Sequence, residues 1–185
     1  MEPLSSSPVK IQQSDAKFAE EVARRSGSSP SRCWHCLSCA AGCPFFAAMD
    51  HAPNRILRLI QLGLRKEALE SSTIWICVGC HTCSIQCPMA IDMAAIMDAL
   101  RQIALEENVT IAEPGILSFH REVLDSIYKH GRAHKLEIML RYKLNQRDLL
   151  SDFGVGLKML AKRKLDLLPS KISDIQSVRR CFHHE

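Results

Sequence analysis

The chain has 185 residues, of which 46% are hydrophobic and 24% are charged, and its formal net charge is +4. This composition suits one folded domain with extensions, or two very small domains, and it does not suit a disordered chain. No run of about 18 apolar residues occurs, so we expect no segment that spans a membrane by itself.

The first 14 residues, MEPLSSSPVKIQQS, are rich in Ser and Pro, and we expect them to be flexible. They lack the apolar core of a secretory signal, so the expected location is the cytoplasm, with any membrane association made through partners. Nine cysteines in that compartment do not suggest a disulfide framework, because cytosolic thiols are kept reduced. The cysteines therefore indicate metal ligation or thiol catalysis.

Helical spacing of apolar residues predicts an all-α fold. The first expected helix is capped by Asp15 and ends at Gly27. A second, over residues 54–71, has an apolar stripe opposite a stripe rich in arginine. A third is capped by Asp92 and runs to about Glu107. The inward residues are expected to be Ile56, Leu57, Ile60 and Leu64 in the second helix, and Ile96, Met97, Leu100, Ile103 and Ala104 in the third.

Two cysteine motifs flank the second of these helices. The first is CWHCLSCAAGCP at residues 33–44, and the second is CVGCHTCSIQCP at residues 77–88. Both read C-x2-C-x2-C-x3-C-P, and every cysteine and proline of the second lies 44 positions after its counterpart. This register indicates an internal repeat.

The spacing is typical of ligands for [4Fe–4S] clusters, in which each of four irons takes one thiolate. Three closely spaced cysteines can wrap one cluster, and in two-cluster ferredoxins the fourth cysteine of each motif ligates the other cluster. We therefore predict two clusters with crossed ligands. The first is assigned to Cys33, Cys36, Cys39 and Cys87. The second is assigned to Cys77, Cys80, Cys83 and Cys43.

Zinc is the competing interpretation, because paired C-x2-C sequences also form zinc sites that staple an interaction protein. Zinc takes four ligands, however, and each motif offers three closely spaced cysteines and a fourth followed by proline. The motifs therefore favour two iron–sulfur clusters.

Beyond residue 110 the chain is expected to continue as helices, from Pro114 to Gly131, then over 132–146, and more weakly over 147–164. From Lys129 to Lys164 there are ten Lys or Arg and three acids, which indicates a solvated face or, more specifically, a surface that docks a protein partner. Nucleic-acid binding is not expected, because aromatic residues make up only 5% of the chain and do not alternate with the basic ones.

These patterns divide the chain into four parts. We expect a flexible N-terminus over 1–14 and an α-helical ferredoxin-type domain with two [4Fe–4S] clusters over 15–110. A helical extension suited to partner docking is expected over 111–164. The tail over 165–185 is expected to be extended, since Pro169 interrupts any helix there.

The motifs, the linker PNRILRLIQLGLRKEAL and, more weakly, HREVLDSIYKHGRAHKLEIMLRYKL and LAKRKLDLLPSKI resemble the C subunit of heterodisulfide reductase. This resemblance implies a non-catalytic electron-transfer role in an oxidoreductase complex. It also implies two partner subunits, one with flavin and iron–sulfur clusters, the other a disulfide-reducing protein with Cys-Cys-Gly motifs. In methanogens the substrate of that family is the mixed disulfide of coenzymes M and B.

Leu37 departs from the family pattern, which often has Gly at that position. Iron–sulfur subunits of glycerol-3-phosphate, glycolate and succinate dehydrogenases carry similar motifs and remain the alternative. This chain has no Cys-Cys pair and no Gly-rich nucleotide loop, so no catalytic or flavin site is expected in it.

Other residues near the motifs have simpler expected roles. His35 and His81 are expected to be hydrogen-bond donors near the clusters or exposed side chains. Trp34 and Trp75 are expected to shield the clusters from water. The remaining expectations are core packing for Met89, Met93 and Met97, and a free thiol in the tail for Cys181.

Overall fold

The computed structural model describes residues 14–146, 159, 172 and 174–182. Within these ranges the chain forms helices and no strand, which confirms the expected all-α fold. The chain divides into two compact units, Met1–Glu113 and Pro114–Glu185. Each unit is described by itself below.

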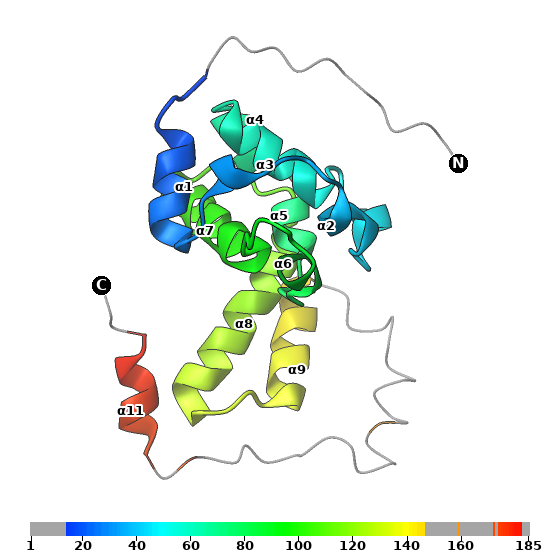
Figure 1. Cartoon of the computed structure of the whole chain (residues 1–185). Coiled ribbons are helices and arrows are strands. Elements are labelled where there is room, and N and C mark those ends of the chain that lie inside the picture. The colour runs from blue at the N-terminus through cyan, green and yellow to red at the C-terminus, as the bar shows by residue number, and fades with distance from the viewer. Residues whose placement is uncertain (1–13, 147–158, 160–171, 173, 183–185) are drawn as a thin grey trace. The chain divides into compact units, whose positions relative to one another are not determined.

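The first unit contains both cysteine motifs (Figure 1). Its longer helices are α1 (Phe18–Ser26), α3 (Pro53–Gln61) and α7 (Met93–Glu106). Its shorter helices are α2 (Ser38–Ala41), α4 (Arg65–Leu69), α5 (Thr73–Ile76) and α6 (Thr82–Ile85), with single 3-10 turns η1 (Pro30–Arg32) and η2 (Phe46–Ala48).

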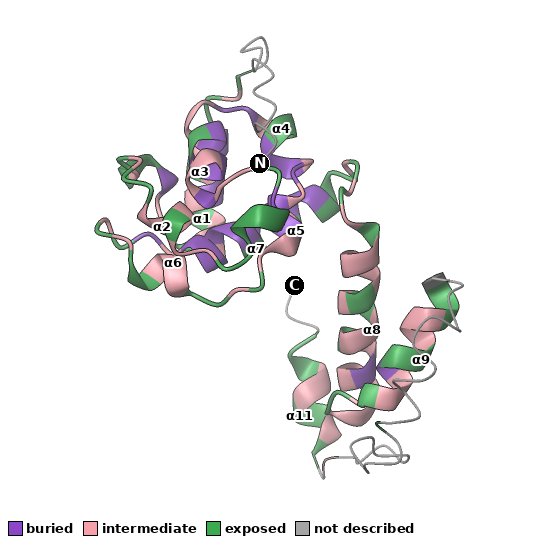
Figure 2. Ribbon diagram, turned by 90° about the vertical axis from the view of Figure 1, so that its right-hand side faces the viewer, coloured by how far each residue is buried: buried purple, intermediate pink, exposed green. Residues whose placement is uncertain are grey.

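Helix α7 is the centre of this unit and packs against α1, α4 and α5. Figure 2 shows the buried residues gathered where these helices and α3 face one another. All of the inward residues expected from the sequence are buried, and Ile56, Ile60, Ile96 and Leu100 are fully enclosed. Phe18 and Val22 of α1 complete this core. A shared apolar core therefore holds the segments on either side of each motif.

The single helix expected over 54–71 is wrong, because the structure has two helices there. Leu62 ends α3, and Gly63 then adopts a left-handed conformation with φ of +67°. The Gly63 carbonyl accepts a hydrogen bond from the Asp15 amide at 2.8 Å. A single glycine within a helical pattern is usually tolerated, but here Gly63 breaks the helix where it contacts Asp15, just before α1.

The expected helix ends are partly confirmed. Asp92 caps α7, since its carboxylate accepts from the amides of Ala94 and Ala95. Gly27 ends α1 with φ of +66°. Asp15 accepts from the Lys17 amide, two residues along, but α1 begins only at Phe18, so Asp15 forms a turn before the helix rather than its cap.

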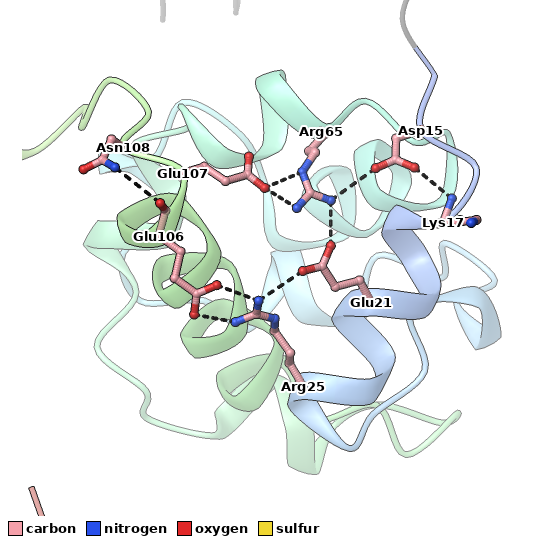
Figure 3. Close-up of polar contacts among 8 residues, drawn as sticks. All are labelled: Asp15, Lys17, Glu21, Arg25, Arg65, Glu106, Glu107 and Asn108. Atoms are coloured by element: carbon pink, nitrogen blue, oxygen red, sulfur yellow. Dashed lines mark hydrogen bonds and ion pairs between the residues drawn. The ribbon is translucent and has the colours of Figure 1, made fainter. Parts of the chain in front are cut away.

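A network of ion pairs joins α1, α4 and the end of α7 (Figure 3). The Arg65 guanidinium bonds Glu21 at 2.7 Å and Asp15 at 3.2 Å, and its Nε bonds Glu107 at 2.8 Å. Hydrogen bonds to Glu107 and Glu21 raise the pKa of Arg65 further above its ordinary value. Arg25 pairs in the same way with Glu106 and Glu21. Together these contacts fix α1 against α4 and the end of α7.

We expect Arg65→Gln to lower the free energy of unfolding of the first unit by about 1–2 kcal/mol, because it removes one centre of a half-buried charge network. Urea unfolding at low ionic strength measures this change. Arg24→Gln, an exposed cation on the same helix as Arg25, is the control and should cost less than about 0.5 kcal/mol. The expected cost should also shrink in molar salt, and a cost independent of salt would contradict an electrostatic origin.

The second unit contains α8 (Pro114–His130), α9 (Lys135–Gln146) and the short α11 (Ile175–Arg180), with α9 and α11 each packed on α8. Pro114 starts α8 and Gly131 follows it with φ of +74°, as the sequence predicts. The buried Ser126 hydroxyl accepts from the His134 amide at 2.9 Å, which closes the turn between α8 and α9. Most residues of these helices are half-exposed or exposed, as the pink and green ribbon of Figure 2 shows, and the exposed ones include Leu124, Leu140 and Leu144.

The prediction of an extended tail is wrong for residues 175–180, which form α11. Asp174 accepts from the Ser177 amide at 3.2 Å and so caps this helix. The expectations for 1–13 and for most of 147–173 lie outside the described residues. Among the described residues, no helix is long and apolar enough to cross a membrane.

Candidate iron–sulfur centre

The two motifs repeat one backbone path. In the first, His35 and Leu37 take left-handed conformations with φ of 56° and 66°. In the second, Gly79 and His81 do so with φ of 62° and 58°, and each lies 44 positions after its counterpart. Alternating left-handed residues make a tight coil that turns successive cysteines toward the same side. The departure at Leu37 therefore falls on a position where glycine would relieve backbone strain.

Each motif ends in one helical turn, α2 or α6, and the two turns pack against each other. The structure thereby brings the eight motif cysteines into two groups around two cavities. The first cavity is lined by Cys33, Cys36, Cys39 and Cys87. The second cavity is lined by Cys43, Cys77, Cys80 and Cys83.

The two cavities are similar in size and character. The first has about 370 Å³ of empty space and the second about 430 Å³, part of it open to solvent. Apolar side chains of α3 and α7 form the inner walls, and Met93 lines both cavities. Cysteine sulfur beside an apolar wall is the lining that a cubane cluster requires. Within the described residues, no group of three or more Cys, His, Asp or Glu side chains is arranged to hold a single metal ion.

The sulfur atoms differ in exposure within each motif. Cys36 and Cys80 are exposed, and hydrogen bonds with Ser38 and Thr82 lower the pKa of their thiols. Burial raises the pKa of Cys39 to about 11, with Cys33 and Cys83 adding to that rise. Burial also raises the pKa of Cys33, Cys77 and Cys83. The buried sulfurs therefore carry negative charge most readily when a bound cation balances it, as in metal ligation.

Asp50 holds the loop after the first motif against the helix that leads into the second. Its carboxylate accepts from the Ser71 hydroxyl at 2.7 Å and from the amides of Ser72 and Thr73 at 3.1 Å. The Thr73 hydroxyl donates to the same carboxylate at 2.7 Å and accepts a hydrogen bond from the His51 amide at 3.0 Å. These bonds hold the first residues of α5, and Cys77 directly follows the last residue of that helix. Asp50 thus fixes one motif relative to the other.

Burial alone would raise the pKa of Asp50, but hydrogen bonds from Thr73, Ser71 and the backbone outweigh it and hold the pKa well below its usual range. A lowered folded pKa contributes stability above the unfolded value near 3.9, and that contribution is lost as the pH falls through the folded pKa. We expect Asp50→Asn to cost about 1–2 kcal/mol, a range reduced because the residue is partly exposed.

Thermal unfolding of both proteins from pH 8 to pH 5.5 tests this expectation. The stability gap between wild type and Asp50→Asn should be constant over that interval, because Asp50 stays ionised throughout. A gap that widens as the pH falls from 7 to 5.5 would mean that the carboxyl has a raised pKa in the folded protein and would contradict the assignment.

In each motif, a side chain from another part of the unit donates a hydrogen bond to the backbone carbonyl of the first cysteine. The Gln61 amide donates to the carbonyl of Cys33 at 3.2 Å and to that of Pro30 at 3.0 Å. The Arg101 guanidinium donates to the carbonyl of Cys77 and, through Nε, to that of Ile74 at 2.5 Å. Sequence reasoning missed Gln61 and Arg101, because each lies on a helix remote from the motif that it supports.

The other predicted neighbours of the motifs behave differently from one another. The His35 ring bonds Gln61 at 3.0 Å, and His81 lies 3.6 Å from the Asp92 carboxylate. Trp34 lines the first cavity although it is 77% exposed, so its shielding of a cluster stays a prediction. The same expectation is wrong for Trp75, which is buried but lines neither cavity.

The methionines and the ninth cysteine follow their expectations more closely. Met93 and Met97 are buried as expected, whereas Met89 is half-exposed beside the first cavity. Cys181 is an exposed free thiol in the second unit.

Residues 32–92 match the family model of the 4Fe-4S dicluster domain. The chain is 26% identical over 163 residues to the C subunit of the ferredoxin:CoB-CoM heterodisulfide reductase of Methanosarcina acetivorans, covering 85% of this chain and 62% of the relative. It is 26% identical to a protein of Archaeoglobus profundus that is named as like the heterodisulfide reductase C subunit, covering 84% of this chain and 86% of the relative. It is also 30% identical over 102 residues to an iron-sulfur C subunit of the CoB–CoM heterodisulfide reductase of Methanocaldococcus jannaschii, covering 55% of this chain and 50% of the relative.

The match to the Methanosarcina protein thus spans about 62% of that relative's length, and the match to the Archaeoglobus protein spans 86%. All three relatives are named after the same component of the same enzyme, and the matched domain takes its name from two [4Fe–4S] clusters. The resemblance read from the cysteine motifs is therefore confirmed, and so is the expected cofactor. The chain is thus similar over most of its length to heterodisulfide reductase C subunits, and residues 32–92 match a domain that binds two [4Fe–4S] clusters.

Proposed function

We propose that this chain is the electron-transfer subunit of a heterodisulfide reductase-type complex and relays electrons through two [4Fe–4S] clusters. Its proposed ligands are Cys33, Cys36, Cys39 and Cys87 for the first cluster, and Cys77, Cys80, Cys83 and Cys43 for the second. It would receive electrons from a flavin-containing iron–sulfur partner and deliver them to a disulfide-reducing partner with Cys-Cys-Gly motifs. The chain itself would carry no catalytic site.

The lining of the two cavities is the observation that carries this proposal. Each cavity takes three cysteines from one motif and the fourth from the other. Four thiolates per cavity complete the ligand set of one cubane. The exchange of Cys43 and Cys87 also keeps both cavities on one small scaffold, and short separation favours electron transfer between them.

When bound, each cluster supplies a site that takes up or releases one electron. The chain's own residues bind, orient and protect that site. Left-handed turns at Leu37 and His81 aim the thiols inward, Met93 and its apolar neighbours exclude water, and Asp50 fixes the two motifs against each other.

The helical extension is proposed to dock a partner of the same complex. Leu124, Leu140 and Leu144 of α8 and α9 are each more than half exposed. The basic residues near them are partly neutralised within the unit, since Lys129 and Arg141 both pair with Asp125. Exposed leucine side chains of this kind suit a protein partner better than they suit solvent.

Expression of the chain with and without candidate partners tests the function. We expect a brown protein with about eight irons per chain that binds a flavoprotein with its own clusters and a Cys-Cys-Gly protein. Stoichiometric zinc without visible absorption would contradict the clusters. Full iron content together with binding to the flavoprotein of a glycerol-3-phosphate, glycolate or succinate dehydrogenase would contradict the heterodisulfide reductase assignment alone.

A further inference from the structure

Several contacts of the cysteines repeat between the two halves of the centre. The backbone amide of His35 donates to the Cys33 sulfur at 3.4 Å, and the amide of Gly79 bonds Cys77 in the same way. The sulfur of each second cysteine lies 3.5 Å from a hydroxyl, that of Ser38 for Cys36 and that of Thr82 for Cys80. Each of these pairs is offset by 44 positions, so both cavities share one pattern of neutral contacts.

One difference that changes the charge is the side chain that binds the carbonyl of the first cysteine. Gln61 binds the carbonyls of Pro30 and Cys33. Arg101 binds the carbonyls of Ile74 and Cys77, which again lie 44 positions later. The two carbonyl pairs are equivalent, but a neutral amide serves the first and a permanent cation serves the second.

The charge of Arg101 acts in a poorly solvated place. Its side chain is only 16% exposed, so water screens it weakly. Asp98 pairs with it at 2.8 Å but is 62% exposed, so its opposing field is more strongly screened. On the first side, Arg58 lies 3.3 Å from the Gln61 oxygen, but it is exposed and contacts Gln61 rather than the cysteine. The Asp92 carboxylate lies 3.6 Å from the His81 ring beside the second cavity, but it is 45% exposed, so water screens it as well. Arg101 is therefore expected to make the field at the second cavity more positive than that at the first.

We propose that Arg101 makes the cluster of the second cavity the one with the higher reduction potential, so that an electron shared by the two clusters resides there. This inference rests on the proposed function. Reduction adds one negative charge, and a fixed cation nearby favours the reduced form. The electron comes from an external donor protein. When it passes between the cavities, the first centre is oxidised by one electron and the second is reduced by one.

A redox titration of the loaded protein, followed by electron paramagnetic resonance, tests the role of Arg101. Arg101→Gln keeps a hydrogen-bond donor and removes the charge. We expect one of the two midpoint potentials to fall while the other stays near its wild-type value. The equilibrium for electron sharing should change by about tenfold, which is about 59 mV for one electron. Arg101→Lys, which keeps the charge, should restore most of the potential, whereas a purely structural role for the guanidinium fork would give no rescue.

Arg58→Gln is the matched control, and both of its potentials should equal those of wild type. Unchanged potentials in Arg101→Gln, or equal shifts of both, would overturn the proposal. If Arg101→Gln fails to hold its cluster, Asp98→Asn decides. It removes the exposed counter-charge without contacting Cys77, so the same potential should rise, and no rise would overturn the proposal. A wild-type protein without two reducible clusters would instead contradict the proposed function itself.

Discussion

Cys43→Ala is expected to damage the same cluster as Cys80→Ala, although Cys43 lies in the other motif. Both side chains line the second cavity, whereas Cys36 and Cys87 line the first. Electron paramagnetic resonance of the reduced variants should therefore sort them into two pairs. The signal altered in Cys43→Ala should be the one altered in Cys80→Ala, and Cys36→Ala and Cys87→Ala should share the other. Iron content should fall from about eight toward about four per chain in each variant.

Cys181→Ala is the control for this series. Its thiol is exposed and belongs to the second unit, so iron content and both signals should be unchanged. If the pairing instead followed the motifs, with Cys43→Ala grouped with Cys36→Ala, the crossed ligand assignment would be wrong. If all four variants lost both signals, the two clusters would depend on each other for assembly, and the pairing would have to be read from partially loaded protein.

Gly63→Ala is expected to destabilise the first unit by roughly 3 kcal/mol or more. Gly63 has φ of +67°, which costs a residue with a side chain about 1 kcal/mol. A Cβ there would also lie 2.5 Å from the backbone oxygen of Asp15, and a backbone atom cannot move aside as a flexible side chain can. Relief of this clash would break the hydrogen bond from Asp15 to Gly63 and separate α1 from the turn between α3 and α4. Urea unfolding of the loaded protein measures the loss.

Gly27→Ala separates the two causes. Gly27 has nearly the same φ of +66°, but no atom lies within 4 Å of its Cβ position. We expect this control to cost only about 1 kcal/mol, the conformational part alone. Equal costs for the two variants would mean that the approach of Asp15 to Gly63 does not matter for stability.

Much of the helical structure could be predicted from the sequence because its causes are local. The apolar spacing of α7, the Asp92 cap and the left-handed Gly27 each depend on a few neighbouring residues. The break at Gly63 could not be predicted in this way, because its cause is a backbone contact 48 positions away. Tryptophan side chains are usually largely buried, but the fold leaves Trp34 77% exposed.

For the candidate centre, too, local spacing could be predicted from the sequence and contacts between distant residues could not. The sequence alone determined which eight thiols belong together, since C-x2-C-x2-C-x3-C-P repeats at a constant offset of 44, and knowledge of iron–sulfur ligation then suggested the crossing. Only the tertiary structure decided what surrounds them. Gln61 and Arg101 bind carbonyls at the first cysteines, and Asp50 binds the helix before the second motif, each across 20 to 30 positions of chain and through hydrogen bonds that carry no sequence signature. The spacing of the cysteines is a property of the sequence, whereas the electrostatic field at a cluster depends on which charged side chains the packed helices place beside it.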